Sequence, residues 1–230
     1  MHEFFEGSVF FAVFLTLLSY CIGLLIQKKL KHIIFNPLLI AIIITATVLI
    51  VFDFDYPTYK ANASFISFLL TPATVCLAIP LYEQFELLKK NAAAVLCGIT
   101  SGIISCLCSV LVFAIIFRLD HATYVTLLPK SITTAIGIGV SSELGGYESI
   151  TVASIILSGI LGNIFAVPFC KLCRITEPIA KGVAIGTSSH AIGTTKALEI
   201  GDAEGAMSSL SIVVAGLLTV VLAPIFANFI

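Results

Sequence analysis

The stretch GTSSHAIGTTKALEIGD, residues 186–202, decides the fold of this chain because it sets polar residues between long apolar segments. It combines glycines and small hydroxyl side chains with one histidine, one lysine and two acids. Glycine permits non-helical backbone, and Ser or Thr hydroxyls can hydrogen-bond to loosened backbone or to a ligand. The stretch therefore predicts an irregular segment that presents polar groups inside an apolar protein.

The composition around this stretch is that of a membrane protein. Of 230 residues, 59% are hydrophobic and 11% are charged, whereas about a quarter of the residues in soluble domains are charged. No charged residue occurs in 91–117, 149–170 or 205–230, and about 20 apolar residues suffice to span a bilayer. We predict an all-α polytopic membrane protein with a single membrane domain, 1–230. The net charge of −1 argues against a nucleic-acid partner.

Eight apolar segments can be recognised, of which several are interrupted. The acidic start of the chain and the basic QKKLKH after the first segment indicate a retained span rather than a cleaved signal peptide. We therefore predict seven to eight membrane segments, including broken or re-entrant helices. The segments are 8–26, 34–52, 63–82, 91–117, 124–142, 149–170, 182–198 and 205–228.

Segment 63–82 is the first candidate for a broken helix. Pro72 and Pro80 both fall inside its apolar run, and each removes a backbone hydrogen bond. In a bilayer, broken helices persist where they are buried in protein or line a watery cavity. An ordinary proline kink is the alternative. We assign as broken-helix residues Asn36, Thr71, Pro72 and Thr74.

The distribution of Lys and Arg predicts the orientation of the chain. Lys28, Lys29 and Lys31 place the first loop in the cytoplasm and the N-terminus outside. The later clusters at 89–90 and 171–181 both fall inside only if 124–147 enters the membrane and returns to the same face. We therefore predict a re-entrant segment at 124–147, although an irregular full span would give a similar pattern.

An internal echo links this segment to the opening stretch. At an offset of 56 residues, SITTAIGIGVSSELGG (131–146) aligns with TSSHAIGTTKALEIGD (187–202), and both contain A-I-G-x5-E-[LI]-G. One apolar span, 149–170, separates the two copies, so two re-entrant copies would enter from opposite faces and meet near the midplane. This geometry is typical of inverted-repeat transporters, and it makes 182–202 the second candidate re-entrant segment.

Basic residues within these two copies indicate an anion site. Lys130, His190 and Lys196 lie among hydroxyls at predicted membrane depth, where ionisable residues are costly and usually functional. Together with half-helix N-termini they suit a small carboxylate substrate. Glu143 and Glu199 are candidates for coupling to H⁺ or Na⁺. The predicted substrate-binding residues are Lys130, Ser131, Thr133, Thr134, Ser188, Ser189, His190, Gly193, Thr194 and Lys196.

Each of these residues also has a purely structural interpretation. Lys196 could extend to the membrane interface, His190 could be a packing residue, and the two glutamates could lie in solvated loops. An intramembrane enzyme with Ser188 or Ser189 as nucleophile is disfavoured because no G-x-S-x-G elbow or acidic partner is evident. Cys170-x-x-Cys173 lacks a matching second pair, so we expect no metal and no cofactor.

Four sequence blocks resemble the LrgB/CidB family of bacterial membrane proteins, and the resemblance covers nearly the whole chain. This family is associated with control of murein hydrolase activity and autolysis, often as an antiholin-like partner of a smaller LrgA/CidA protein. It includes the plastidial glycolate/glycerate translocator, and bacterial members are implicated in pyruvate uptake. The blocks are NPLLIAI (36–42), LLTPATVCLAIPLYEQ (69–84), LPKSITTAIGIGVSSELGG (128–146) and GTSSHAIGTTKALEIGDAEGAMSSLS (186–211).

The resemblance and the residues together predict a multi-pass protein of the bacterial cytoplasmic membrane that transports small monocarboxylates such as pyruvate, glycolate or glycerate. It is not expected to be an enzyme. A holin-like or antiholin-like pore or regulatory subunit acting with an LrgA/CidA-type membrane partner is the alternative. We also expect a homo-oligomer within the lipid bilayer.

Overall fold

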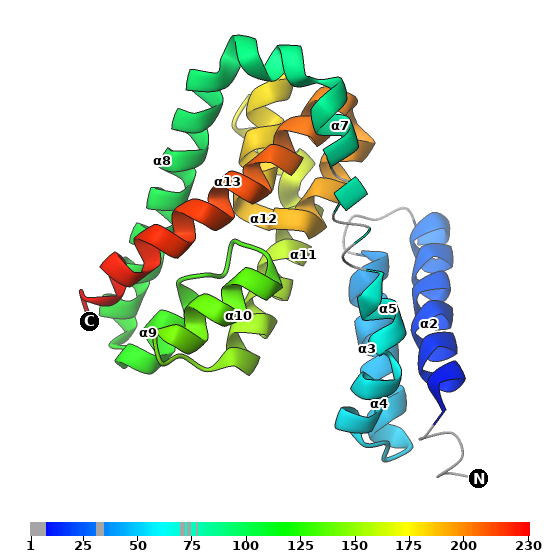
Figure 1. The fold of residues 1–230 in the computed structure, drawn as a ribbon. Helices are drawn as coiled ribbons and strands as arrows, with labels where there is room; N and C mark the ends of the chain where they lie inside the picture. The colour runs from blue at the N-terminus through cyan, green and yellow to red at the C-terminus, as the bar shows by residue number, and fades with distance from the viewer. Residues whose placement is uncertain (1–7, 31–34, 70–71, 73–74, 77) are drawn as a thin grey trace. The chain divides into compact units, whose positions relative to one another are not determined.

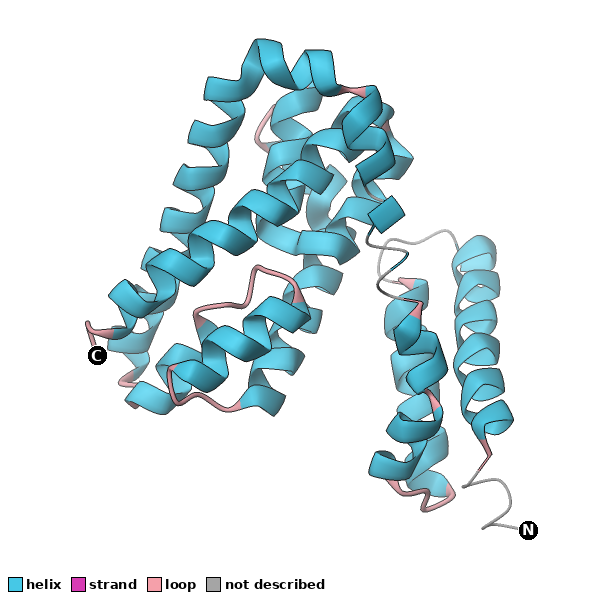
Figure 2. Cartoon of the chain, viewed as in Figure 1, coloured by secondary structure: helices cyan, strands magenta, loops and turns pink. Residues whose placement is uncertain are grey.

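A computed structural model describes residues 8–30, 35–69, 72, 75–76 and 78–230. These residues form helices joined by short loops, without a strand (Figure 2). In the described residues, four helices are long and apolar enough to cross a membrane: Val9–Leu30, Phe85–Phe117, Glu148–Leu172 and Asp202–Ala227. The chain is therefore a helical, multi-pass membrane protein. It divides into two compact units, Met1–Cys76 and Leu77–Ile230.

The first unit is built on two apolar helices, α2 (Val9–Leu30) and α3 (Pro37–Val51), followed by the short α4 (Tyr56–Asn62) and α5 (Ser64–Phe68) (Figure 1). Pro37 begins α3, as expected from its missing N–H. Asn36 is the N-cap, and its side chain accepts hydrogen bonds from the backbone N–H groups of Leu38 and Leu39. Asn36 thus starts a regular helix and does not lie within a broken one.

The predicted broken helix at 63–82 is only partly described. Helix α5 ends at Phe68, and α7 (Ala78–Glu83) begins the second unit. Pro72 is exposed in a helical position. Thr71 and Thr74 lie outside the described residues, so their predicted role stays a prediction.

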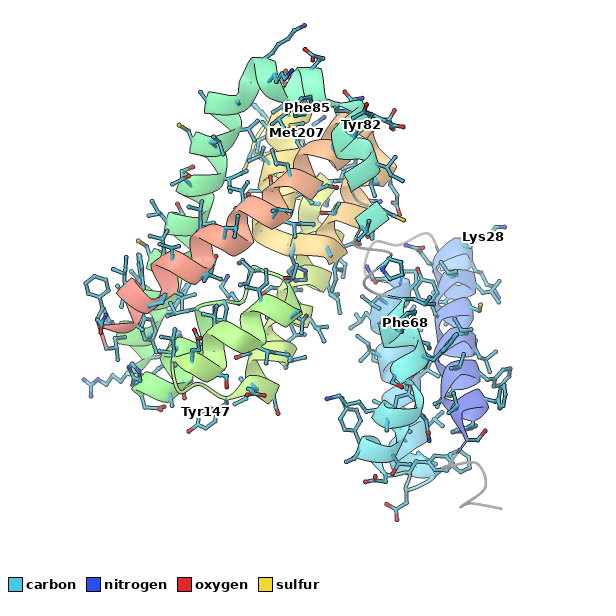
Figure 3. The ribbon with its side chains drawn as sticks, viewed as in Figure 1. Lys28, Phe68, Tyr82, Phe85, Tyr147 and Met207 are labelled. Atoms are coloured by element: carbon cyan, nitrogen blue, oxygen red, sulfur yellow. The ribbon has the colours of Figure 1, made fainter. Side chains whose placement is uncertain are left out.

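The second unit is framed by three long helices, α8 (Phe85–Phe117), α11 (Glu148–Leu172) and α13 (Asp202–Ala227). Between them in sequence lie α9 (His121–Leu127), α10 (Thr134–Glu143) and α12 (Pro178–Ile200). Phe85, at the start of α8, and Tyr147, just before α11, lie at opposite ends of this unit (Figure 3). We call these the Phe85 end and the Tyr147 end.

Helix α12 folds back on itself at His190. This residue has φ 42° and ψ −141°, so it is non-helical and separates two half-helices. In the first half, Gly182 packs on the backbone of Glu204; in the second half, Leu198 packs on Gly205. Because residues near both ends of α12 contact the first turn of α13, the two halves form a hairpin that starts and ends at the Phe85 end.

Helices α9 and α10 form another hairpin, at the Tyr147 end. Because it precedes α12 in the sequence, we call it the first hairpin and the α12 hairpin the second. The chain turns at 128–133, and the residues after α10 return to the end of α9. There the Thr126 hydroxyl accepts a hydrogen bond from the Tyr147 backbone N–H at 2.7 Å, and Thr151 Oγ1 donates to the Thr126 carbonyl at 3.0 Å. The two hairpins therefore approach the middle of the unit from opposite ends.

The 56-residue offset seen in the sequence extends beyond the two echoing stretches. Arg118 and Arg174 both follow the end of a long helix with positive φ, 52° and 56° respectively. Pro168 in α11 and Pro224 in α13 are related by the same offset. The first hairpin and α11 are thus followed by the second hairpin and α13 in matching order.

These hairpins explain why the count of seven to eight membrane segments is not supported. The predicted segments 124–142 and 182–198 are each divided into two short helices, and α3, with 15 residues, falls below the length of a full span. The charge-free runs 91–117, 149–170 and 205–228, together with 8–26, correspond to the four long apolar helices. Hydropathy shows how apolar a segment is, but it does not show whether the chain reverses its direction within that segment.

The hydrophobic core of the second unit joins α8 to α9 and α13. Fully buried side chains of α8, among them Ile99 and Leu107, belong to the same cluster as Met207 of α13. Tyr124 of α9 is completely buried, and its hydroxyl donates to the Phe226 carbonyl at 2.9 Å. This core holds the first hairpin against the helices that frame it.

Candidate functional site

A cavity of about 750 Å³ lies within the second unit, between α8, the tip of the first hairpin and the first half of α12. Gly98 of α8 packs on Val183, and Gly102 packs on Thr187, so α8 and this half of α12 run side by side in the same direction. The cavity lining begins near Asn91 and Glu177, at the Phe85 end, and reaches Ser109 and Ser131. On α8 this is about 27 Å at 1.5 Å per residue.

The two sequence echoes meet at this cavity. Ser131 and Thr187 are equivalent under the 56-residue offset, and both line it. Ser131 Oγ lies 3.0 Å from Cys106 Sγ, and Thr187 packs on Gly102, one turn earlier on α8. The Thr187 side chain is 5% exposed, and its hydroxyl has no hydrogen-bond partner in the described part of the chain. A buried hydroxyl of this kind costs free energy until a ligand or water pairs with it.

Lys130 supplies positive charge beside these hydroxyls. Its ammonium donates to Ser131 Oγ at 3.5 Å and forms no ion pair with any described acid. Among the described residues of the lining, Lys130 and Glu177 are the charged ones, and Glu177, the N-cap of α12, belongs to the Phe85 end. The inner part of the cavity therefore combines one ammonium with several small polar side chains.

His190 is placed against α11 and not in the cavity lining. Its side chain is 3% exposed, and Nε2 lies 3.0 Å from the Ile155 carbonyl oxygen. Gly159 of α11 leaves the space that the imidazole occupies, and Gly162 does the same for Ser189. His190 and Ser189 thus anchor the turn of the second hairpin on α11.

The second half of α12 is also directed away from the cavity. Lys196 pairs with Glu199 at 2.6 Å, with side chains 33% and 66% exposed. Thr194 Oγ1 donates to the His190 carbonyl and lies 2.7 Å from Ser208 Oγ. Gly193 packs on the first half of its own helix. None of these residues is part of the described cavity lining.

The remaining predicted residues divide in the same way. Ser188 lines the cavity, and its hydroxyl donates to the Ala184 carbonyl at 2.8 Å. Thr133 is the N-cap of α10, whose first residue is Thr134, so both mark the start of a half-helix near the cavity tip. Glu143 is exposed at the end of α10. The structure thus gathers Lys130, Ser131 and Ser188, and it disperses the others.

Sequence reasoning missed the contribution of α8. Its small and polar residues recur at helical spacing, which a search for interrupted segments passes over because 91–117 is a long uncharged run. Thr187 is one of the hydroxyl residues in the stretch 186–202, but it is not among the predicted substrate-binding residues. The α8 residues that line the cavity are Asn91, Ala94, Val95, Gly98, Gly102, Ser105, Cys106 and Ser109.

Comparison of the sequence with known proteins assigns the chain to a family. The model of the LrgB-like family matches residues 16–229. The chain belongs to the LrgB family. It is 38% identical over 225 residues to the antiholin-like protein LrgB of Bacillus cereus strain B4264, covering 96% of both chains. The antiholin-like protein LrgB of Bacillus anthracis strain A0248 gives the same values.

No solved structure matches this LrgB-family chain. Its cavity and its two hairpins therefore have to be interpreted from their own geometry. That geometry provides a mostly apolar pocket that holds one ammonium and several small hydroxyls at the point where two chain reversals meet. Such a pocket can hold a small anion.

Proposed function

We propose that this LrgB-family protein transports small monocarboxylates of the pyruvate, glycolate or glycerate type across the bacterial cytoplasmic membrane. The observation that carries the proposal is Lys130, whose ammonium lies beside Ser131 in a cavity that Thr187 also lines; the Thr187 hydroxyl is buried and has no partner in the described residues. A carboxylate could pair with the ammonium while a neighbouring hydroxyl donates to it. Ser131 and Thr187 also suit the oxygens that these acids carry beside the carboxylate, one in pyruvate and glycolate and two in glycerate.

The arrangement of the two hairpins favours a transporter over a protein with a purely structural role. Two chain reversals related by a 56-residue offset approach from opposite ends and meet beside the middle of α8. Half-helices that begin at such a junction, here α10 and the second half of α12, direct their positive N-termini toward bound anions. We therefore retain the inverted repeat as part of the proposal, with 124–147 and 182–202 as re-entrant segments.

Charge at the two ends of the second unit supports an orientation. Lys89 and Lys90 lie at the Phe85 end, as do Lys171, Arg174 and Lys181 around the α11–α12 turn. Under the positive-inside rule this end is cytoplasmic, so the part of the cavity lined by Asn91 and Glu177 lies on the cytoplasmic side. The same rule, applied to Lys28 and Lys29 at the end of α2, places the N-terminus outside.

The roles of the dispersed residues change within this proposal. His190 and Ser189 position the second hairpin, and Lys196 forms a surface pair with Glu199 that is a weaker candidate for substrate or ion coupling. Coupling to H⁺ or Na⁺ through Glu143 or Glu199 remains part of the proposal to be tested by ion gradients. We assign no catalytic chemistry to the cavity.

A second candidate function follows from the relatives, which are named antiholin-like. A holin-like pore or a regulatory subunit that controls murein hydrolases with an LrgA/CidA-type partner would need membrane insertion and assembly. It would not need a selective cationic cavity. The two functions are compatible if carboxylate flux through the protein is what influences autolysis.

Uptake by proteoliposomes distinguishes the candidates. Purified protein should accumulate labelled pyruvate or glycolate, the uptake should saturate, and unlabelled monocarboxylates should compete. Imposed H⁺ and Na⁺ gradients identify the coupling ion in the same preparation. Release of an encapsulated dye such as carboxyfluorescein, without saturable uptake, would support a pore and overturn the transporter.

A further inference from the structure

A second cavity, of about 510 Å³, lies at the turn between α11 and α12 and has a different character. Lys171, Arg174 and Lys181 line it together with Val167 and Ile200. It does not include any residue of the proposed transport cavity. The lining thus combines cationic and apolar residues, at the end of a membrane-spanning helix where lipid headgroups are expected.

Two of its three cations are available for a ligand. Lys181 pairs with the buried Glu204 at 3.6 Å, whereas Lys171 and Arg174 are exposed and form no ion pair with the acids that the structure describes. The net charge of the four side chains is positive. No acid other than Glu204 is close enough to Lys181 to pair with it in the described residues.

The local backbone holds Arg174 in place. The Arg174 N–H donates to the Lys171 carbonyl at 3.2 Å, and the Ile175 N–H donates to the Cys170 carbonyl at 2.8 Å. These two bonds form a Schellman cap with Arg174 at the left-handed position, φ 56°. Glycine is usual there, since a side chain at positive φ is strained.

The adjacent helix end adds to the positive potential. Helix α12 begins at Pro178, and its N-cap, Glu177, makes no side-chain capping bond. The first backbone N–H groups of α12 therefore receive no hydrogen bond from their cap and contribute partial positive charge, which the Glu177 carboxylate offsets in part. Thr176, directly before this cap, also lines the cavity.

We propose that this cavity binds the phosphate headgroup of an anionic glycerophospholipid. Lys171 and Arg174 pair with the phosphodiester, and the acyl chains lie on Val167 and Ile200. A free phosphate ion would use the cations but gain nothing from the apolar residues. A lipid satisfies both, and basic pockets between membrane helices are suited to anionic headgroups. The site is independent of the transport proposal, because it shares no residue with the first cavity.

The chain contains a matched control for the key residue. Arg118 ends α8 in the same cap geometry, with Arg118 N–H donating to Ile115 at 3.2 Å and Leu119 N–H to Ala114 at 2.9 Å. It is the 56-residue equivalent of Arg174 but lies at the Tyr147 end, next to Asp120 and not beside a second cation. Arg118→Gln therefore carries the same backbone cost and the same loss of one charge.

Binding is measured by native mass spectrometry on protein released from nanodiscs, with phosphatidylglycerol or phosphatidylcholine added at graded concentration. We expect preference for phosphatidylglycerol, and about fivefold weaker binding for each cation removed, so about 25-fold for Lys171→Gln with Arg174→Gln. Arg118→Gln should leave the affinity unchanged. Lys171→Glu with Arg174→Glu should abolish the preference, and melting temperature verifies that each variant is folded.

Three results would overturn the proposal. Equal binding of the two lipids by the unaltered protein would remove the anionic headgroup from the site. Unchanged affinity in folded Lys171→Gln/Arg174→Gln protein would place the lipid elsewhere. Displacement of bound phosphatidylglycerol by millimolar inorganic phosphate, with the same affinity in all variants, would show a general anion effect in place of a lipid site.

Discussion

Replacing Lys130 with glutamine gives the sharpest test of the proposed transport site. The substitution keeps the side-chain length and polarity but removes an ammonium that has no acidic partner among the described residues. A hydrogen bond to a charged group contributes about 1.5–3 kcal/mol, so affinity for pyruvate or glycolate should fall by roughly 10-fold to 150-fold. Equilibrium binding of the labelled acid to purified protein measures this directly.

Lys196→Gln is the matched control for Lys130→Gln. It removes the same group from the same kind of half-helix environment, but Lys196 is paired with Glu199 in a partly exposed position. Exposed ion pairs contribute about 0–1 kcal/mol, and Lys196 does not line the cavity, so monocarboxylate affinity should change by less than about twofold. Equal losses in both variants, or unchanged affinity in folded Lys130→Gln protein, would refute the assignment of the cavity.

The remaining predictions address the hairpins and their ends. In a cysteine-free background, single cysteines at Asp120 and Gly146 should be labelled by an impermeant reagent from one face and a cysteine at Glu177 from the other; labelling of Gly146Cys with Glu177Cys from the same face would contradict the first hairpin. Gly186→Ala places a methyl group against the Ser208 backbone and should cost about 1–3 kcal/mol of stability in a thermal melt, whereas Gly139→Ala, which meets no atom within 4 Å, should be neutral or slightly stabilising. Thr151→Val removes the hydroxyl that joins Thr126 to Ser141 and should increase labelling of a Ser131 cysteine from the Tyr147 end; unchanged labelling would show that this contact does not close the path. The Asp120 carboxylate accepts hydrogen bonds from the Thr123 hydroxyl and backbone N–H, which lowers its pKa, so the stability from this cap is present above the unfolded pKa and is lost as pH falls through the lowered one; Asp120→Asn should remove that acid-dependent loss in pH-dependent melts.

The sequence predicted which polar residues occur at the two chain reversals, but it did not predict how the surrounding helices pack against them. Glycines, hydroxyls and the A-I-G-x5-E-[LI]-G echo located both hairpins, because such residues are uncommon in regular apolar spans and their spacing is visible without a structure. The break at His190 and the start of α10 at Thr134 fall at equivalent positions of that echo. Local composition was sufficient here since the signal lies within one segment.

The direction of each side chain was not predictable from the same signal. His190, Lys196 and Lys130 are all basic residues near a break, yet one packs on Ile155, one pairs with Glu199, and one lines the cavity. Which neighbour a side chain meets depends on how α8 and α11 pack around the hairpins, and no local pattern encodes that packing. For the same reason, the Ser and Gly residues of α8 became informative only when their partners on α12 were known.

Hydroxyl contacts join α11 to the first hairpin at the Tyr147 end of the second unit. Within the second unit, Thr151 Oγ1 lies 2.7 Å from Ser141 Oγ and 3.0 Å from the Thr126 carbonyl oxygen, so α11 contacts both arms of the first hairpin. Toward the Phe85 end, residues of the first half of α12 line the cavity but do not fill it. A transporter built from two equivalent hairpins needs a second state, in which the contacts made by the first hairpin are made by the second hairpin and the reverse. In that state the hydroxyl contacts around Thr151 would open, and the first half of α12 would close against α8. Ser131 and Thr187 are equivalent positions that both line the cavity, so a substrate held between them could remain bound while the surrounding contacts exchange.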